Sequence, residues 1–343
     1  MSRTPLKNAI VGPVACLAVL ISAAVHSEPL AFKRTISSTN AVQAGVSGVG
    51  GGSGNITVAG VSGTVTGAYL YWHGINRSGA GAVYNNANIL LAGSPVVGVS
   101  QGDASTNCWG AGSSRAYEAN VTPLISGNGS YLLSGLSSAA GHSANGASLV
   151  VFFDDGDNTN NRDFAIFTGN DSSHADAGFP SDAAGWTASL PVYYRQGTVR
   201  ATMHVADGQE FTDAAVNFAT GNGAATVNDS ATLFDGISLP NAGTSRATTG
   251  LYDVHAIDIT PAFGATPGTT TLSVAGAPGG DCLALNTLVV DLVGFTTCAA
   301  EGFTGSKLTL CRQVCEIEQT PTRLLSLIKL YKTAYREDPA CAL

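Results

Sequence analysis

The sequence has few charged residues and few long side chains. Only 12% of its 343 residues are charged, and it holds two methionines and three tryptophans. Such a composition is poor for long helices. Acidic residues outnumber basic ones by 24 to 16, which leaves a formal net charge of −8 and no basic stripe. Binding to nucleic acid or to an anionic membrane surface is therefore not expected.

Several catalytic signatures are also missing. The chain contains no Gly-x-Ser-x-Gly nucleophile elbow and no His-Glu-x-x-His zinc motif. The five histidines beyond the N-terminal segment are His73, His142, His174, His204 and His255. None is within four residues of another, so a metal cluster would have to be assembled by folding. These absences favour a protein that is not an enzyme.

Glycine, by contrast, is abundant, with 42 residues, and 44% of the chain is hydrophobic. Many turn residues between short apolar runs are typical of an all-β protein. The length allows two ordinary domains, at roughly 150 residues each. We therefore expect a mainly β fold in two parts.

The first residues have the pattern of a secretory leader. Arg3 and Lys7 precede an apolar run over residues 9–24, and small residues follow, which predicts a signal peptide over 1–27. Cys16 raises the alternative of a lipid anchor, but most of the apolar run follows it. We expect an exported protein that is secreted, held at the cell surface or periplasmic, with no membrane span after cleavage.

Removal of the leader would leave an even set of cysteines: Cys108, Cys282, Cys298, Cys311, Cys315 and Cys341. An even number in an exported chain predicts disulfides. Cys108 is expected to pair with Cys282, since each half of the main region has one cysteine. Cysteines four apart on a helix are badly placed to bond one another, which favours Cys298 with Cys315 and Cys311 with Cys341. A metal site at the C-terminal cysteines would lack a neighbouring second ligand pair.

An aromatic run over residues 67–74 predicts a central strand. Tyr71 would point to one face and Trp72 to the other, as in one sheet of a sandwich, and Trp72 is expected in the core. Before this strand, the Gly/Ser-rich stretch 46–54 predicts flexible coil. Residues 28–62 are therefore interpreted as an N-terminal segment and linker.

Four short motifs occur twice, which indicates an internal duplication. Residues 63–65, 89–93, 120–123 and 148–151 match residues 197–199, 232–236, 258–261 and 287–290. The third motif of each copy places a Thr before a Pro (Thr122, Thr260), where the hydroxyl would cap a short helical turn. Together with the apolar strands, the repeats predict tandem antiparallel, jelly-roll-like β-sandwiches at 63–180 and 181–296.

The same motifs resemble a family of uncharacterised secreted and surface bacterial proteins. Its members carry a Tyr-Leu-Tyr-Trp strand, an Asp-Val-Thr corner and a Gly-x-x-Leu-Val-Val strand, to which residues 69–72, 120–122 and 146–151 are similar. Asn120 stands where Asp is usual, although Asp258 restores it in the second copy. The resemblance covers roughly residues 55–295. It implies a β-sandwich fold and an envelope location, and no activity.

The last residues, 297–343, predict a small helical hairpin. Thr304 precedes one helical pattern, and Thr320 with Pro321 begins another that Pro339 ends. Two short helices bury too little surface to fold alone, and disulfides would supply the missing stability. The segment is similar to short Cys-rich tails of other secreted bacterial proteins.

One loop holds the richest set of oxygen ligands: Asp154, Asp155, Asp157, Asn158 and Asn160. Carboxylates and amides grouped in this way bind calcium, although the EF-hand glycine and terminal Glu are absent. Asp, Asn and Gly are also the residues of an ordinary solvated turn. A structural calcium ion and a plain turn are both open, and no cofactor is otherwise required.

Two further sets of residues are candidates for function. Glu210, one of few glutamates in the sandwich region, would be the first catalytic candidate. Paired carboxylates for glycoside chemistry could come from Asp207, Glu210 and Asp213, or from Asp171 and Asp176. Trp109 and Trp186 stand in glycine-flanked segments outside the apolar strands. Tryptophans there either fill the end of a core or offer a flat face to a sugar ring.

These observations favour a secreted or cell-surface binding protein, without catalysis, that recognises an extracellular glycan, polymer or surface protein. A hydrolase acting on glycans or glycoproteins is one alternative, since tandem jelly rolls also carry amidase sites. A structural subunit of an envelope layer or filament is another. Acidic residues lining a groove between the copies would favour the hydrolase, and an exposed edge strand would favour assembly.

Overall fold

The structure is a computed structural model. It describes residues 28–76, 84–102, 113–138, 141–173, 185–209, 211–227, 233–236, 251–276, 280–295, 297–317, 320–336, 339 and 341.

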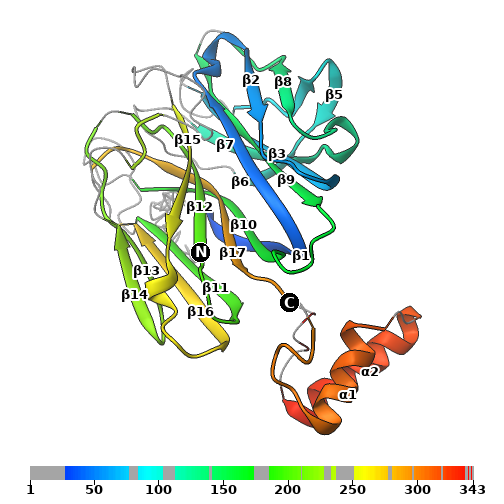
Figure 1. Cartoon of the computed structure of the whole chain (residues 1–343). Coiled ribbons are helices and arrows are strands. Elements are labelled where there is room, and N and C mark those ends of the chain that lie inside the picture. Colours follow the sequence, from blue (N-terminus) through cyan, green and yellow to red (C-terminus); the bar gives the residue numbers. More distant parts are fainter. Residues whose placement is uncertain are drawn as a thin grey trace, which may run out of the picture.

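The chain forms strands up to residue 293 and two helices after it (Figure 1). Residues 28–154 form β1 (Glu28–Ser47), η1 (Val49–Gly51), β2 (Ser53–Val58), β3 (Thr64–Asn76), β4 (Asn88–Leu91), β5 (Ser94–Val97), β6 (Val99–Gly102), β7 (Ser113–Asn120), η3 (Thr122–Leu124), β8 (Gly129–Ser134) and β9 (His142–Asp154). Residues 162–293 form β10 (Arg162–Ser172), β11 (Trp186–Tyr194), β12 (Arg200–Ala206), β13 (Val216–Thr220), β14 (Gly223–Val227), β15 (Tyr252–Asp258), η4 (Thr260–Ala262), β16 (Gly268–Gly276) and β17 (Ala284–Val293). The tail contains α1 (Gly305–Cys315) and α2 (Pro321–Tyr335).

The described strands form one large sheet and two small ones. The large sheet has nine strands in the order β15-β12-β17-β10-β1-β9-β3-β7-β6. The first outer sheet is β2-β8-β4-β5, and the second outer sheet is β11-β16-β13-β14. Each outer sheet packs on one half of the large sheet around its own apolar core. The predicted mainly β fold, with two antiparallel sandwiches and a helical hairpin, is therefore confirmed.

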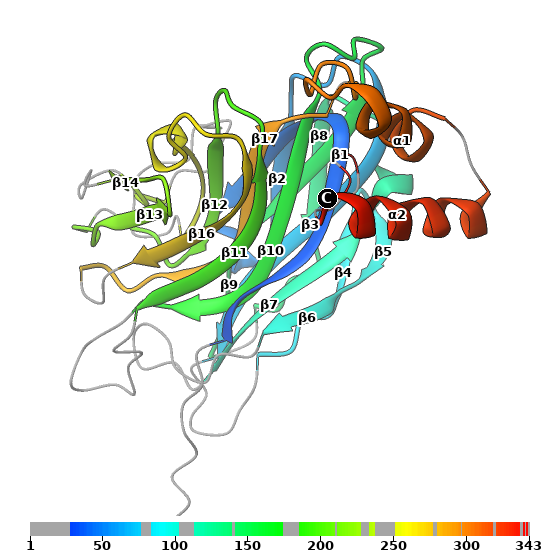
Figure 2. The same cartoon turned by 90° about the horizontal axis from the view of Figure 1, so that it is seen from below.

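Strand β1 belongs to both sandwiches, which the sequence did not indicate. Residues 28–39 pair with β10 of the second sandwich, and residues 40–47 pair with β9 of the first. Between the two halves Ser38 has φ 53°, a left-handed conformation that bends the strand. Figure 2 shows β1 beside β10 at the centre of the molecule. The segment interpreted as preceding the sandwiches thus supplies a strand that both of them share.

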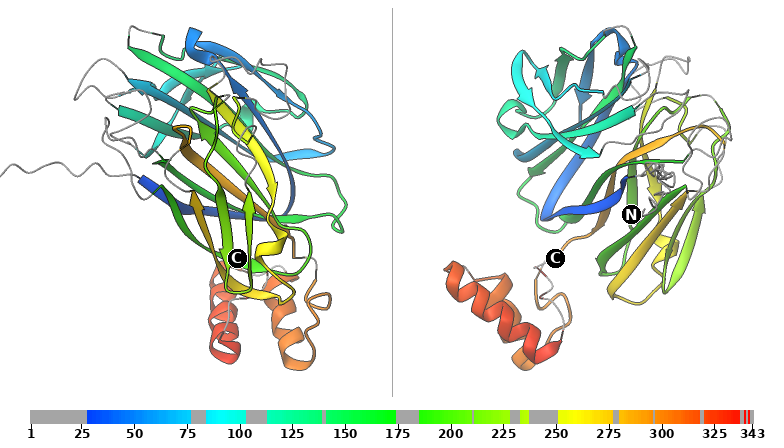
Figure 3. Two further views of the ribbon diagram at one scale, coloured as in Figure 1. Left: turned by 90° about the vertical axis from the view of Figure 1, so that its left-hand side faces the viewer. Right: turned by 180° about the vertical axis from the view of Figure 1, so that it is seen from behind.

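The large sheet also folds so that its two halves face each other. Tyr71 of β3 and Phe152 of β9 belong to the same buried cluster as Phe164 of β10 and Val289 of β17. The ring of Tyr71 meets the ring of His204, on β12, edge to face at 5.9 Å. Figure 3 shows the two sandwiches inclined to one another, with the helices beyond their end. The halves are therefore packed into one body.

The duplication is visible in the hydrogen bonds of its corners. Asn120 Oδ1 accepts from the backbone N–H and hydroxyl of Thr122, and Asp258 Oδ1 does the same for Thr260. A 3-10 turn with Pro in its first positions follows each corner. The Thr hydroxyls do not cap these turns as predicted: Thr122 instead accepts the N–H of Ala68 on β3, and Thr260 accepts the N–H of Val199, just before β12. The corner therefore ties each turn to the large sheet.

The prediction of flexible coil over residues 46–54 is wrong. The stretch contains the end of β1, η1 and the start of β2. Gly54 would place a Cβ 2.6 Å from Val49, and Gly52 has φ 94°. Glycine is needed here because the chain turns tightly and packs closely, and composition alone does not distinguish this from a linker.

The tail helices begin where the sequence predicted, after Thr304 and Thr320. Neither Thr side chain makes a capping hydrogen bond, and α2 ends at Tyr335, with Arg336 in a left-handed conformation. Among the described residues no helix is both long enough and apolar enough to cross a membrane.

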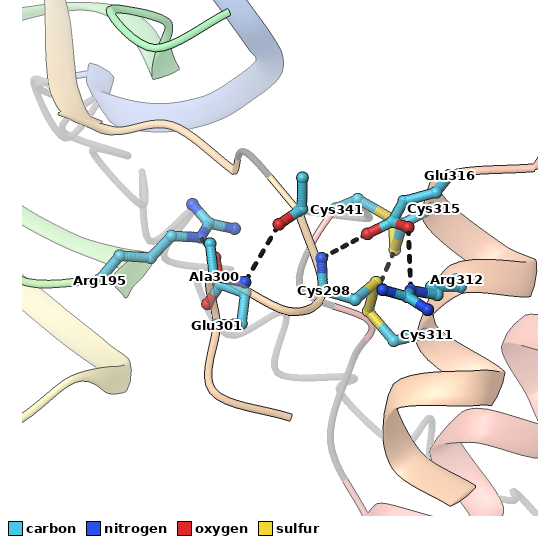
Figure 4. The surroundings of a disulfide bond; sticks show 10 residues. Arg195, Cys298, Ala300, Glu301, Cys311, Arg312, Cys315, Glu316 and Cys341 are labelled. Carbon is cyan, nitrogen blue, oxygen red and sulfur yellow. Dashed lines mark hydrogen bonds and ion pairs between the residues drawn. A yellow bond between two sulfur atoms is a disulfide. The ribbon is translucent and has the colours of Figure 1, made fainter. Parts of the chain in front are cut away.

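The predicted pairing of the tail cysteines is wrong, although all four form disulfides. The bonds are Cys298–Cys311 and Cys315–Cys341 (Figure 4). The segment after β17 turns back on α1, so that the Cα atoms of Cys298 and Cys311 are 5.9 Å apart. Cys298 also donates its N–H to Glu316, which fixes this segment beside the helix. Cys282 is disulfide-bonded as well, and its predicted partner, Cys108, lies outside the described residues.

Candidate functional site

A groove of about 270 Å³ lies at the side of the second sandwich, where β1, β10 and β11 meet. Its walls are Phe32, Thr35, Asp163, Ala165, Pro191, Val192, Tyr193, Arg195, Thr269 and Leu292. These residues come from five strands and from the end of β11, so the groove depends on the whole sandwich.

The groove exists because the large sheet extends one strand further than the second outer sheet that packs on it. Strand β11 is the edge of the second outer sheet, whereas the large sheet continues past β10 to β1. Phe32 of β1 packs edge to face on Phe167 at 5.7 Å, yet 53% of its surface is exposed. An aromatic ring is thus presented beside a concave surface, the usual form of a small ligand site.

Arg195 closes one end of the groove. Its Nη1 donates to Asp163 Oδ2 at 2.5 Å, and its Nε donates to Glu301 Oε1 at 2.9 Å. The guanidinium also lies over the ring of Tyr193, 4.9 Å from its centre. Only 5% of the Arg195 side chain is exposed. Glu301 belongs to the segment that the Cys298–Cys311 disulfide holds, so the tail reaches the groove through this ion pair (Figure 4).

The charges at this end do not favour an anionic ligand. Two carboxylates, Asp163 and Glu301, face one guanidinium. Burial raises the pKa of Glu301, and the adjacent Arg195 opposes that rise. The other lining residues that carry a hydroxyl are Thr35, Tyr193 and Thr269. The groove therefore combines an aromatic surface with groups that hydrogen-bond neutral, hydroxyl-bearing molecules.

A second polar cluster lies between the sandwiches, where His204 and Ser148 are fully buried and Gln43 is half-buried. His204 Nε2 is 2.8 Å from Gln43 Oε1, and its Nδ1 is 2.7 Å from Ser148 Oγ. Since the amide oxygen can only accept, Nε2 carries the proton and Nδ1 accepts from the Ser148 hydroxyl. Burial lowers the pKa of His204 to about 3, so the ring is neutral at pH 7.

His73 occupies a comparable position. Its Nδ1 is 3.0 Å from Asn145 Oδ1, and Asn145 donates its amide N–H to Asp207. Burial lowers the pKa of His73 to about 4. These side chains have no exposed surface, which suits a structural role in joining the sandwiches better than contact with a substrate.

The structure changes the interpretation of Trp186. This residue begins β11 opposite Gly276 in the register with β16, and only 2% of its surface is exposed. A Cβ at Gly276 would lie 2.7 Å from the indole, so the glycine makes room for the ring in the core. The indole also meets Phe234 edge to face at 5.7 Å. The prediction of a sugar platform at Trp186 is therefore wrong.

The other residues singled out from the sequence are either buried or outside the residues that the structure describes. Trp109 and Glu210 lie outside the described residues, and their roles stay predictions. Asp207 and Asp213 are 0% and 4% exposed, so neither presents a carboxylate to a polymer. Trp72 is 1% exposed, donates to Asn86 O at 3.0 Å and lies in the core as predicted.

The proposed calcium loop has the hydrogen bonds of consecutive turns. Asp154 and Asp155 accept N–H groups two residues ahead, and Asp157 accepts both the N–H and the hydroxyl of Thr159. These bonds from Thr159 lower the pKa of Asp157. Asn160 donates to Asp155 Oδ2, and Asn158 Oδ1 accepts from Asn161. The carboxylates thus accept hydrogen bonds from the backbone of the loop, as in an ordinary solvated turn.

Ligand atoms of three His, Cys, Asp or Glu side chains gather within 4.8 Å of one another at one place in the described chain: Cys298, Cys311 and Cys315. These sulfurs are engaged in the tail disulfides. Calcium binding at the 154–160 loop stays a prediction.

No family model and no curated protein matches the chain. Two solved structures have a distant likeness. One is an atomic structure of Sulfolobus turreted icosahedral virus, 11% identical, covering 88% of this chain and 98% of that one, with a TM-score of 0.23. The other is a crystal structure of the STIV MCP, 10% identical, covering 77% and 98%, with a TM-score of 0.22. Likenesses this weak carry no argument about the present protein.

The groove residues were not found from the sequence. Phe32 lies in the segment interpreted as preceding the sandwiches, and its pattern Leu30-Ala-Phe32 is the one local sign of a strand there. Tyr193 and Arg195 follow the apolar part of β11. Their proximity depends on the pairing of β1 with β10, which the local sequence does not reveal.

Proposed function

We propose that this chain is an exported, non-catalytic protein that binds an extracellular polymer, a glycan, in the groove between β1 and β11. The observation that carries the proposal is the half-exposed Phe32 in a groove that Thr35 and Thr269 also line. Sugar rings have apolar C–H faces and a rim of hydroxyls, and they bind where an aromatic face and polar groups converge.

The size and charge of the groove support this class of ligand. Ligand pockets commonly measure about 300–1,000 Å³, so a volume near 270 Å³ suits one ring-sized unit of a longer molecule. The excess carboxylate at the Arg195 end disfavours phosphate or sulfate. The size and charge of the groove therefore favour a neutral glycan as the ligand.

The hydrolase alternative has less support. Its candidate carboxylates at Asp207 and Asp213 are buried, and Asp163 in the groove is held by Arg195. A glycosidase needs two carboxyl groups on either side of an accessible bond. The groove offers recognition without that pair.

The test is retention on insoluble polysaccharides and cell-wall fractions. Phe32→Ala and Tyr193→Ala should each weaken retention by about tenfold, the effect of losing roughly 1.4 kcal/mol of stacking. Phe211→Ala is the matched control, because Phe211 is 56% exposed and does not line the groove. All three variants should keep the thermal midpoint of the parent.

The proposal fails if the parent chain binds none of the polysaccharides. It also fails if Phe211→Ala weakens retention as much as Phe32→Ala does.

A further inference from the structure

The first half of β1 is attached less regularly than the second. Residues 40–47 pair with β9 at every position without a shift. Residues 28–39 pair with β10 through three register shifts, between Glu28 and Ala31, Phe32 and Arg34, and Ile36 and Thr39. Among the described side chains from 29 to 36, Leu30 alone is buried. The first half is therefore paired less regularly and buries few side chains.

A bend separates the two halves. Ser38 has φ 53°, which residues with a side chain seldom adopt. Its N–H donates to Asp163 Oδ1 at 2.9 Å, and its hydroxyl donates to Phe295 O at 3.1 Å. These bonds hold the bend while residues 28–37 lie on β10. If those residues leave, the bend can straighten and the strained φ is relieved.

The surface that residues 28–37 cover is complementary to the sequence of this strand. Without it, β10 would present an edge of unpaired N–H and C=O groups. Glu118 of β7 is 7% exposed and pairs with Arg34, with Lys33 Nζ at 3.9 Å. Leu30 fills part of the second core. An occupant therefore needs an apolar residue and, a few positions later, adjacent cations, and residues 30–34 of this chain supply both.

We propose that residues 28–37 are an exchangeable strand, which lies along β10 of a second copy of this chain. The exchanged strand makes the same contacts between chains that it makes within one, so association gives up only the bonds of Ser38 at the bend. Each copy both gives and accepts a strand. Exchange in one direction produces a chain of copies, and reciprocal exchange produces a dimer.

The groove is affected by the exchange. Phe32 and Thr35 would come from one copy, and Tyr193 and Arg195 from its neighbour. The inference itself does not depend on what the groove binds, and its test requires no ligand.

The test uses two preparations of the full chain with native disulfides intact and different affinity tags. One carries Thr35→Cys and the other Ala165→Cys, which are opposite one another in the β1/β10 register. After mixing at high concentration under oxidising conditions, a covalent heterodimer should form, with a yield that rises with concentration. Ser38→Gly should reduce this yield, because glycine adopts the bend without strain.

Two controls make the result decisive. Val42→Cys mixed with Val151→Cys, an opposed pair in the regular half of β1, should give no heterodimer. A single chain with both Thr35→Cys and Ala165→Cys should close its internal disulfide, which shows that the site is folded and reactive. If that internal bond forms while the mixed preparations give no more heterodimer than the Val42 control, the strand does not exchange.

Discussion

Asn145 of β9 donates its side-chain amide to the carboxylate of Asp207, which follows β12. The bond crosses from one sandwich to the other, and neither residue has any exposed surface. Asp207 has φ 68°, so the backbone is bent to bring its carboxylate to this position. Polar geometry, and not apolar contact alone, therefore fixes how the two sandwiches meet.

Asn145→Ala is expected to lower the free energy of unfolding by about 1–3 kcal/mol, since a buried acceptor loses a donor. Denaturant titration followed by tryptophan fluorescence measures it. Asn160→Ala, at an exposed position of the β9–β10 loop, is the control and should change stability by less than about 0.5 kcal/mol. An Asn145→Ala chain as stable as the parent would contradict the assigned role.

Stability should fall as the pH drops from about 6.5 toward 4. Burial lowers the pKa of His73 to about 4 and that of His204 to about 3, whereas both titrate near 6.5 when unfolded. Within this window the unfolded chain binds protons that the folded chain excludes, so acid favours unfolding. Each histidine should lower the free energy of unfolding by about 2 kcal/mol between pH 7 and pH 5.

In His204→Gln, the free energy of unfolding is expected to fall less between pH 7 and pH 5, by the contribution of one histidine. Asp281 acts in the opposite direction, because burial raises its pKa to about 6 and its proton is bound more readily in the folded state. Urea unfolding at a series of pH values separates the contributions. An identical pH slope in His204→Gln and parent would show that this ring is not held neutral by burial.

Trp186→Ala should be as destabilising as Trp72→Ala. Both indoles are at most 2% exposed, and removal of a buried Trp typically costs about 3–5 kcal/mol. Thermal unfolding of both variants checks this. A Trp186→Ala chain with the parent's midpoint and weaker polysaccharide retention would restore the platform hypothesis for that residue.

Peptide mapping of the native protein without reduction should recover two links in the tail, Cys298 to Cys311 and Cys315 to Cys341. Cys341→Ser should loosen α2 and leave the sandwiches folded, because the second link closes only the tail. Loss of helical circular dichroism without a change in the main unfolding transition is the expected signature. Links between Cys298 and Cys315 would overturn the assignment.

Short-range sequence patterns correctly predicted the elements that depend only on neighbouring residues. The strand around Trp72, the Thr-Pro corners and the two tail helices follow from periodicity and turn chemistry within a few residues. The shared strand β1 was missed because a Gly/Ser-rich stretch follows it directly and its partners lie about 100–140 residues away. The groove was missed for the same reason, as it forms only where β1 and β11 come together.

The position of β1 also sets the order of folding. Glu28 is paired with Asn170, and Asn40 with Phe153, so the first strand of the chain has no partner until most of the first repeat has been made. Contacts so distant in sequence form slowly, because a long loop must close before they contribute. During synthesis the segment from 28 to 47 therefore waits as an unpaired β-forming stretch. Residues 40–47 can pair once β9 has been made, and residues 28–39 only once β10 has followed.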